Sequence, residues 1–172
     1  MDIKGKNSES IRKYTDNTPR SGVSVDQLQS VQPGLVPLLS VKLTSVPIWD
    51  AQVMVDHFSD LTYVQLIRST IQEETLAGKP AFEILAATFG IRIKRYHAYN
   101  GRFSEQPFRS SIEDSNQTIK FYGVGSHHQN AIVERKIQNL TLGSKTLLLH
   151  AKIYCPEEIT TMLWSYSLKD FA

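Results

Sequence analysis

The segment IKFYGVGSHHQNAIVERKIQNLTLGSKTLLLHA, residues 119–151, combines a short apolar strand, a polar turn and a long amphipathic helix. In the helical part, apolar residues recur every three or four positions with polar residues between them: Ile132, Val133, Ile137, Leu140, Leu147 and Leu148. This spacing predicts a helix that packs one stripe against a core. Glu134 follows the first apolar pair, so we expect it at the margin of the packed face. Arg135 and Lys136 then turn toward solvent or a polyanion.

The composition is that of an ordinary globular domain. The chain has 172 residues, of which 41% are hydrophobic and 21% charged, enough for one domain with its own core. The single cysteine, Cys155, excludes an internal disulfide and a cysteine-rich zinc cluster, which favours a reducing compartment. No apolar run approaches the roughly 18 residues of a membrane helix, and the N-terminus lacks a signal-peptide core. We therefore expect an intracellular protein, nuclear or cytoplasmic, that is neither secreted nor membrane-bound.

The formal charge of +2 does not by itself indicate nucleic-acid binding. Residues 1–22 contain five basic and three acidic side chains, so residues 23–172 balance to zero. The first segment, polar and rich in Ser, Asn and Lys, is interpreted as a disordered arm or remnant linker, and residues 23–172 as the folded domain. Local charge is more informative, because five basic residues surround only Glu134 across the key segment: Lys120, Arg135, Lys136, Lys145 and Lys152. A solvated helix face remains the alternative interpretation.

Upstream, hydrophobic periodicity predicts an ordered series of strands and helices. Alternating apolar residues and turn signals favour three strands, then a helix, a strand, a short helix and a last strand before the long helix. The expected ranges are 23–28, 49–59 and 61–67, then 70–89, 91–97, 107–115 and 119–124, with a final helix opening at Pro156. Pro80 is expected to kink or split the helix at 70–89. The order indicates an α/β fold with one mixed sheet and helices on its faces.

Four sequence motifs resemble the catalytic core of copia-type retrotransposon integrases. They are VSVDQLQS around Asp26, VMVDHFSDLTYVQL from Val53, YHAYNGRF from Tyr96 and GVGSHHQNAIVERKIQNLT from Gly123, followed by LLLHA. The resemblance runs from about residue 22 to the C-terminus and implies a ribonuclease H-like, five-stranded mixed sheet with helices on both faces. It also implies metal-dependent DNA strand transfer, with DNA as the partner. A homodimer is a further possible partner state, which the sequence leaves open. The zinc module and the further domains of that family are absent, so the chain looks like a fragment of a polyprotein.

The resemblance implies a metal site built from three carboxylates in the order Asp, Asp, Glu. Hard divalent cations such as Mg²⁺ or Mn²⁺ prefer oxygen ligands, and a pair of them can clamp both oxygens of a phosphoryl transfer. The matching positions are Asp26, Tyr99 and Glu134, and the last two are 35 positions apart (134 minus 99). Asp26 and Glu134 are thus the expected metal ligands, and Tyr99 marks a degenerate catalytic position.

Tyr99 is the most informative departure from the family pattern. A phenol, with an ordinary pKa near 10, is neutral at physiological pH, so the site loses one negative charge and one chelating group. We expect weakened or single-site metal binding and impaired catalysis. Ala131 is a second departure, because the family generally has Gly there. Ala is unfavourable if the backbone needs a positive φ and favourable in the first turn of a helix.

The resemblance also implies that the turn and the start of the long helix contact DNA, through His127, His128, Gln129, Asn130, Arg135 and Lys136. Zinc binding by the two adjacent histidines is the weaker alternative, since they do not easily point at one ion. Asp56 competes for a carboxylate role, but we expect it to cap the turn before Ser59. Two other functions remain open: a non-catalytic remnant that binds nucleic acid or dimerises, and a hydrolase that uses His97 or His128 as a base. No G-x-S-x-G nucleophile motif supports the hydrolase.

Overall fold

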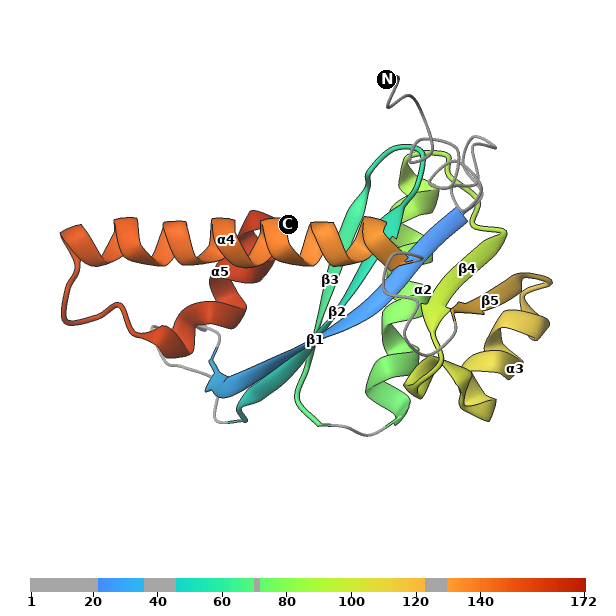
Figure 1. Ribbon diagram of the computed structural model, residues 1–172, viewed down its shortest axis with the longest axis horizontal. Coiled ribbons are helices and arrows are strands. Elements are labelled where there is room, and N and C mark those ends of the chain that lie inside the picture. The colour runs from blue at the N-terminus through green and yellow to red at the C-terminus, as the bar shows by residue number, and fades with distance from the viewer. Residues whose placement is uncertain (1–21, 36–45, 70–71, 123–129) are drawn as a thin grey trace, which may run out of the picture.

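The computed structural model describes residues 22–35, 46–69, 72–122 and 130–172. Five strands, β1 (Gly22–Gly34), β2 (Ile48–Asp56), β3 (Thr62–Ile67), β4 (Arg95–Tyr99) and β5 (Thr118–Tyr122), form one sheet in the order β3-β2-β1-β4-β5. The helices are α2 (Gln72–Thr88), α3 (Gln106–Asp114), α4 (Ala131–Tyr154) and α5 (Trp164–Phe171), with 3-10 turns η1 (Arg102–Ser104) and η3 (Thr161–Leu163) (Figure 1). The expected N-terminal arm, residues 1–22, lies outside the described residues except for Gly22.

The sheet is mixed because its two halves are connected differently. β1, β2 and β3 follow one another and pair antiparallel, with Val25 opposite Met54 and Val53 opposite Val64. β4 and β5 each follow a helix and pair parallel to the preceding part of the sheet. A parallel neighbour requires a crossover connection, which α2 and α3 provide. The topology confirms the expected mixed five-stranded sheet.

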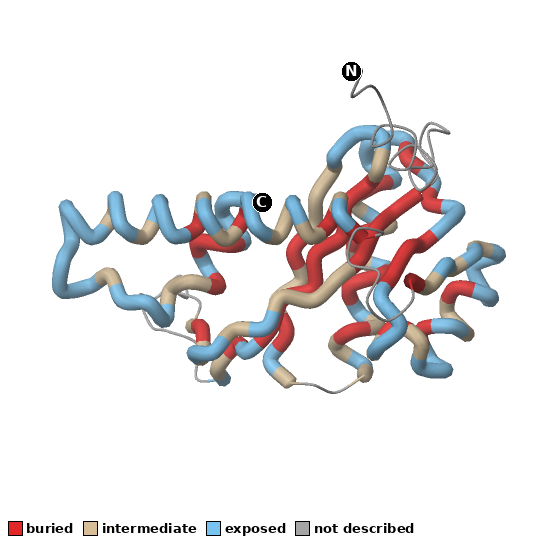
Figure 2. The backbone as a smooth tube through the Cα atoms, viewed as in Figure 1, coloured by how far each residue is buried: buried red, intermediate tan, exposed pale blue. Residues whose placement is uncertain are grey.

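Alternating side chains divide the core into two layers. In β2, Met54 belongs to a cluster with Phe82 of α2, whereas Val53 and Val55 belong to a second cluster with Val133 of α4. Successive strand residues point to opposite faces, so helices cover both sides of the sheet, as expected. Figure 2 shows the buried positions concentrated in the strands and in the parts of the helices that pack on them.

Helix α2 is continuous through Pro80, contrary to the expected kink or split. Pro80 is exposed, and the neighbouring turns are held by buried Thr75 and Phe82 on the opposite side. Tertiary packing therefore compensates for the backbone hydrogen bond that proline removes. Phe89, expected on the packed side, lies beyond the helix and is 61% exposed.

Helix α4 extends past the sheet. Its first half packs on β1 and β2 and its second half contacts α5, leaving the far end free of the sheet (Figure 1). Val133 and Leu140 are buried, but Leu147 is 38% exposed, so the expected packed stripe is shorter than its sequence pattern. The last helix starts at Trp164 and not at Pro156, because residues 156–158 form a turn.

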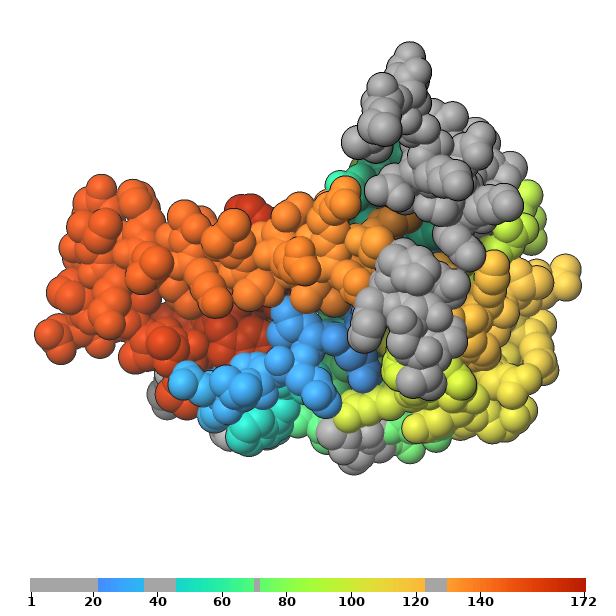
Figure 3. Space-filling view, viewed as in Figure 1, coloured from blue at the N-terminus to red at the C-terminus, as the bar shows by residue number. Residues whose placement is uncertain are grey.

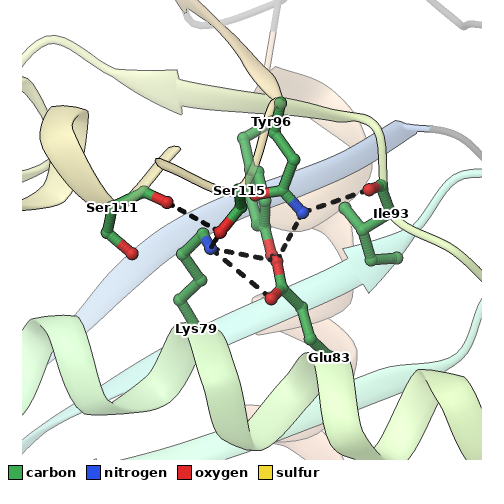
Figure 4. Close-up of polar contacts among 7 residues, drawn as sticks. Lys79, Glu83, Ile93, Tyr96, Ser111 and Ser115 are labelled. Carbon is green, nitrogen blue, oxygen red and sulfur yellow. Dashed lines mark hydrogen bonds and ion pairs between the residues drawn. The ribbon is translucent and has the colours of Figure 1, made fainter. Parts of the chain in front are cut away.

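A polar network links α2, β4 and the turn before β5 (Figure 4). Glu83 forms an ion pair with buried Lys79 at 3.2 Å and accepts hydrogen bonds from the Tyr96 hydroxyl at 2.8 Å and from the Gln117 amide at 2.7 Å. Lys79 also donates to the Ser115 hydroxyl at 3.0 Å. Burial, followed by the Glu83 carboxylate, raises the pKa of Tyr96, which keeps the phenol neutral as a donor. These contacts fasten β4 to α2.

Asp56 caps the turn that joins β2 to β3, as expected. Its Oδ2 accepts hydrogen bonds from the Ser59 backbone N–H at 2.8 Å and from the Ser59 hydroxyl at 2.7 Å. Asp60, next in the turn, has a positive φ of 59°, a conformation that aspartate tolerates better than most residues. The capping role expected of Asp56 from the sequence is thus confirmed.

Candidate functional site

The site predicted from the sequence lies where β4 ends beside β1. Val25 of β1 pairs with Ala98 of β4, and the next residues along the two parallel strands are Asp26 and Tyr99. Val25 and Ala98 both belong to the core under α2. Their neighbours Asp26 and Tyr99 therefore point to the other face, the one that α4 covers.

Asp26 does not close its strand, as its sequence position suggested. β1 runs on to Gly34 because it keeps pairing with β2, where Leu28 lies opposite Ala51 and Gln29 opposite Asp50. Asp26 is level with the end of β4 instead. The strand end at the predicted site is thus the C-terminal end of β4, not that of β1.

The long helix reaches Asp26 through Asn130, the N-cap residue of α4. The Asn130 amide Nδ2 donates to Asp26 Oδ2 at 3.0 Å, and the Gln27 backbone N–H donates to Asp26 Oδ1 at 2.8 Å. Burial raises the pKa of Asp26, while these two hydrogen bonds act in the opposite direction. This contact joins residues 104 positions apart in the sequence.

Glu134 lies one helical turn after Asn130. Residues four apart in a helix share a side of it, so Glu134 lies on the same side of α4 as Asn130. Glu134 is half-buried and comes directly after the fully buried Val133, which is the marginal position expected from the sequence. Ala131 begins the helix and is not among the described residues with positive φ. Alanine in place of the family's glycine therefore causes no backbone strain at this position.

Tyr99 is 42% exposed at the end of β4. Its carbonyl accepts a hydrogen bond from the Gly101 N–H at 2.8 Å, and a Cβ at Gly101 would lie 3.5 Å from the Tyr99 ring. Among the residues that the structure describes, no cluster of three His, Cys, Asp or Glu residues is placed to hold a metal ion.

The predicted nucleic-acid contacts divide into three groups. His127, His128 and Gln129 lie outside the described residues. Asn130 is 4% exposed and bound to Asp26. Arg135 is exposed, whereas Lys136 forms an ion pair with Asp60 of the β2–β3 turn. Among the described members of this set, Arg135 has the most accessible positive charge.

A row of polar and aromatic residues beside the site was not predicted. Ser24 Oγ lies 2.8 Å from His57 Nε2, the His57 and His97 rings are 5.0 Å apart, and His97 stacks on Tyr122 at 5.9 Å. Burial raises the pKa of Tyr122 to about 12. Ser24 and His97 are only 1% and 4% exposed, so a substrate cannot reach them, which argues against His97 as the base of the hydrolase alternative. His128, the other base considered, lies outside the described residues. In the sequence, His97 stands between Tyr96 and Ala98 in a predicted strand. That position was the signal that its side chain lies on the opposite face of the sheet from theirs.

Integrase structures are among the solved structures that resemble this fold. The simian T-cell lymphotropic virus intasome in complex with the PP2A regulatory subunit B56 gamma matches at a TM-score of 0.57 and 17% identity over 87% of this chain. The HTLV-2 integrase catalytic core domain in complex with magnesium, in trimeric and dimeric forms, matches at a TM-score of 0.51 and 20% identity over 86% of this chain.

This chain has the ribonuclease H-like fold of retroviral integrase catalytic cores. It covers 84% and 86% of the two HTLV-2 integrase cores but 47% of the intasome chain, less than half of its length. No protein-family model and no curated protein sequence matches the chain. The integrase-core fold predicted from the sequence motifs is confirmed. Across the described ranges, the helices include none long and apolar enough to cross a membrane.

The substitution Asp26→Asn is expected to raise the melting temperature at pH 7 in the presence of a chelator. Because burial raises its pKa, the folded state binds a proton at Asp26 more strongly than the unfolded state does. Ionised Asp26 therefore destabilises the fold above that pKa. In the variant, the amide oxygen can still accept from the Gln27 N–H, and the amide NH₂ can donate to Asn130 Oδ1 once the Asn130 amide has turned over. The advantage of the neutral variant should shrink as the pH falls through the raised pKa and vanish below the ordinary value of 3.8.

Thermal unfolding of both proteins between pH 3 and pH 7 measures this difference. Glu158→Gln, a change of the same kind at an exposed position, is the matched control and should have little effect. A lower melting temperature for Asp26→Asn at pH 7 would mean that the charge stabilises the fold, contrary to this expectation.

Proposed function

We propose that this chain is a copia-type, retroelement integrase core whose family chemistry is metal-dependent DNA strand transfer and whose own catalysis is impaired. One observation carries the proposal. The Asn130–Asp26 hydrogen bond brings the start of α4 to β1 on the face of the sheet where β4 ends at Tyr99. The proposal assigns Asp26, Tyr99 and Glu134, which are distant in the sequence, to one site of the integrase-core fold.

In this proposal Asp26 and Glu134 hold one Mg²⁺ or Mn²⁺ ion, more weakly than a complete site would. Both are hard oxygen donors, which suits these cations, and the buried Asn130 Oδ1 marks unfilled hydrogen-bonding capacity next to Asp26. A bound cation would neutralise charge developing on the phosphate. The chain itself fixes Asp26 through Gln27 and Asn130, while Tyr99 offers no third negative charge. Strand transfer is therefore impaired, because charge neutralisation is incomplete.

DNA is the proposed partner of the surface around the start of α4. Arg135 offers an exposed guanidinium there, and the helix N-terminus favours phosphate. His127, His128 and Gln129 precede the helix and join the proposed DNA contacts on the resemblance alone. Lys136 is also a proposed DNA contact, although its ammonium group already forms an ion pair with Asp60. Action on DNA agrees with a nuclear or cytoplasmic location.

A non-catalytic remnant is the second candidate, and two observations favour it. By the resemblance Tyr99 occupies the position of an acidic ligand, and α4 from its midpoint onward exposes large apolar side chains: Leu142, Leu149, Ile153 and Tyr154. Exposed apolar residues along one helix favour self-association. Such a protein would bind DNA or dimerise without joining DNA ends. Metal titration separates the candidates, since a filled cation site supports the impaired enzyme.

Binding to labelled duplex ends tests the shared part of both candidates. Arg135→Ala is expected to weaken DNA binding about threefold to tenfold and to lower the slope of log affinity against log salt by about one. Arg109→Ala, which removes an exposed arginine on α3, is the control and should leave binding unchanged. Fluorescence anisotropy at several salt concentrations gives both values. Equal binding by the two variants would contradict DNA contact at the start of α4.

A further inference from the structure

Only one of the two polar atoms of the Asn130 side chain has a hydrogen-bond partner among the described residues. Its Nδ2 donates to Asp26 Oδ2, but its Oδ1 is buried and has no hydrogen-bond partner among the residues that the structure describes. The whole residue is 4% exposed. An unpartnered buried carbonyl oxygen is energetically unfavourable, so its position next to a carboxylate calls for a physical reason.

A rotation of the amide by about 180° would exchange the two atoms. Oδ1 would then face the Asp26 carboxylate, where two oxygens with negative charge density repel each other unless a cation lies between them. Carboxylate and amide oxygens are both ligands of Mg²⁺, Mn²⁺ and Ca²⁺ in proteins. The same amide can therefore serve Asp26 in two ways, as a donor without a cation and as a ligand beside one.

We propose that Asn130 supplies the third oxygen ligand of a single divalent-cation site with Asp26 and Glu134. Its amide oxygen takes over part of the role of the carboxylate that is missing at position 99. Its amide nitrogen holds Asp26 in place when no cation is bound. The proposal rests on the proposed function, from which it takes Asp26 and Glu134 as ligands. It adds a ligand of a different chemical type and from a different part of the chain.

Burial favours this role over a direct contact with DNA. A phosphate or base edge needs an accessible side chain, and Asn130 is almost completely covered, whereas a cation of small radius needs only the oxygens. The position in α4 also fits. Asn130 and Glu134 are one turn apart on the same side of the helix, so the proposal assigns both as ligands of one ion bound at Asp26.

Calorimetric titration with Mn²⁺ of the wild type and three variants tests the proposal. Asn130→Ser keeps an N-cap side chain but is too short to reach the ion, so Mn²⁺ affinity should fall about tenfold or more. Asn130→Asp should bind Mn²⁺ at least about tenfold more tightly and, without metal, unfold at a lower temperature, because two carboxylates then face each other. Asn139→Asp adds the same charge at an exposed position of α4 and should change affinity little.

A second measurement does not depend on the folding of any variant. In wild-type protein labelled with ¹⁵N, the Asn130 side-chain NH₂ resonances should shift on addition of Mg²⁺, since their hydrogen bond to Asp26 breaks. Unchanged resonances at saturating Mg²⁺, equal Mn²⁺ affinity of wild type and Asn130→Ser, or no Mn²⁺ binding by the wild type would each overturn the proposal. DNA binding is measured separately, so a protein that binds duplex ends but no cation would fail this inference without failing the DNA-binding part of the proposed function.

Discussion

Replacing Tyr99 with aspartate should restore DNA strand transfer, with an increase in joined product on the order of 100-fold or more over the wild type. The position lies beside Asp26 across the β1–β4 pairing and is 42% exposed, so a carboxylate there can reach solvent and a cation without a large desolvation cost. The added charge completes an acidic set with Asp26 and Glu134. Tyr99→Asp should also tighten Mn²⁺ binding.

Joining of labelled DNA ends in the presence of Mg²⁺ or Mn²⁺ measures the effect. Tyr99→Phe is the matched control, because it keeps the ring and removes only the hydroxyl, and it should remain as inactive as the wild type. The melting temperature of Tyr99→Asp should change little, since surface substitutions are usually nearly neutral. If the wild type joined DNA ends as well as Tyr99→Asp does, the idea that Tyr99 impairs catalysis would be wrong.

Replacing Glu83 with leucine should have the largest effect on stability, a loss of about 3–5 kcal/mol in the free energy of unfolding. The change leaves the Lys79 ammonium buried, with a side chain only 3% exposed, and leaves the Tyr96 hydroxyl without its acceptor. The remaining described polar partner of Lys79 is the Ser115 hydroxyl at 3.0 Å. An uncompensated buried charge is far more costly than the ion pair is stabilising.

The complementary substitution Lys79→Met should cost less, about 1–2 kcal/mol. It removes the cation but leaves the Glu83 carboxylate with two donors, Tyr96 and Gln117. Urea unfolding of both variants gives the comparison, and Glu73→Leu on the exposed side of α2 controls for the loss of a helix glutamate. Equal losses for the two main variants would show that the network is not organised around Glu83.

The sequence predicted the fold where periodicity and packing agree. Val53 to Val55 are an unbroken apolar run typical of a buried strand and alternate between the two faces of the sheet, and the stripe from Ile132 to Leu140 packs as its spacing suggests. It failed where tertiary contacts override local preference. Pro80 does not break α2 because neighbouring turns are anchored, and Pro156 opens a turn and no helix. Leu147 looked like a core residue, but α4 extends beyond the sheet that would cover it.

The candidate site was predictable as a set of positions but not as a set of contacts. The motifs selected Asp26, Tyr99 and Glu134, and strand pairing and helix position determine how near they come. Nothing in the sequence indicated that Asn130 bonds Asp26, because the contact spans 104 positions and depends on where α4 begins. The ion pair of Lys136 with Asp60 could not be predicted either, because it also joins residues that are distant in the sequence.

The hydrogen bond from Asn130 to Asp26 also separates folding from chemistry. A carboxylate that already has a neutral donor does not need a cation to hold the start of α4 in place. A copy of this domain that binds no cation would thus keep the start of α4 in place against β1. Loss of the proposed chemistry and loss of the fold are therefore separate events for this chain.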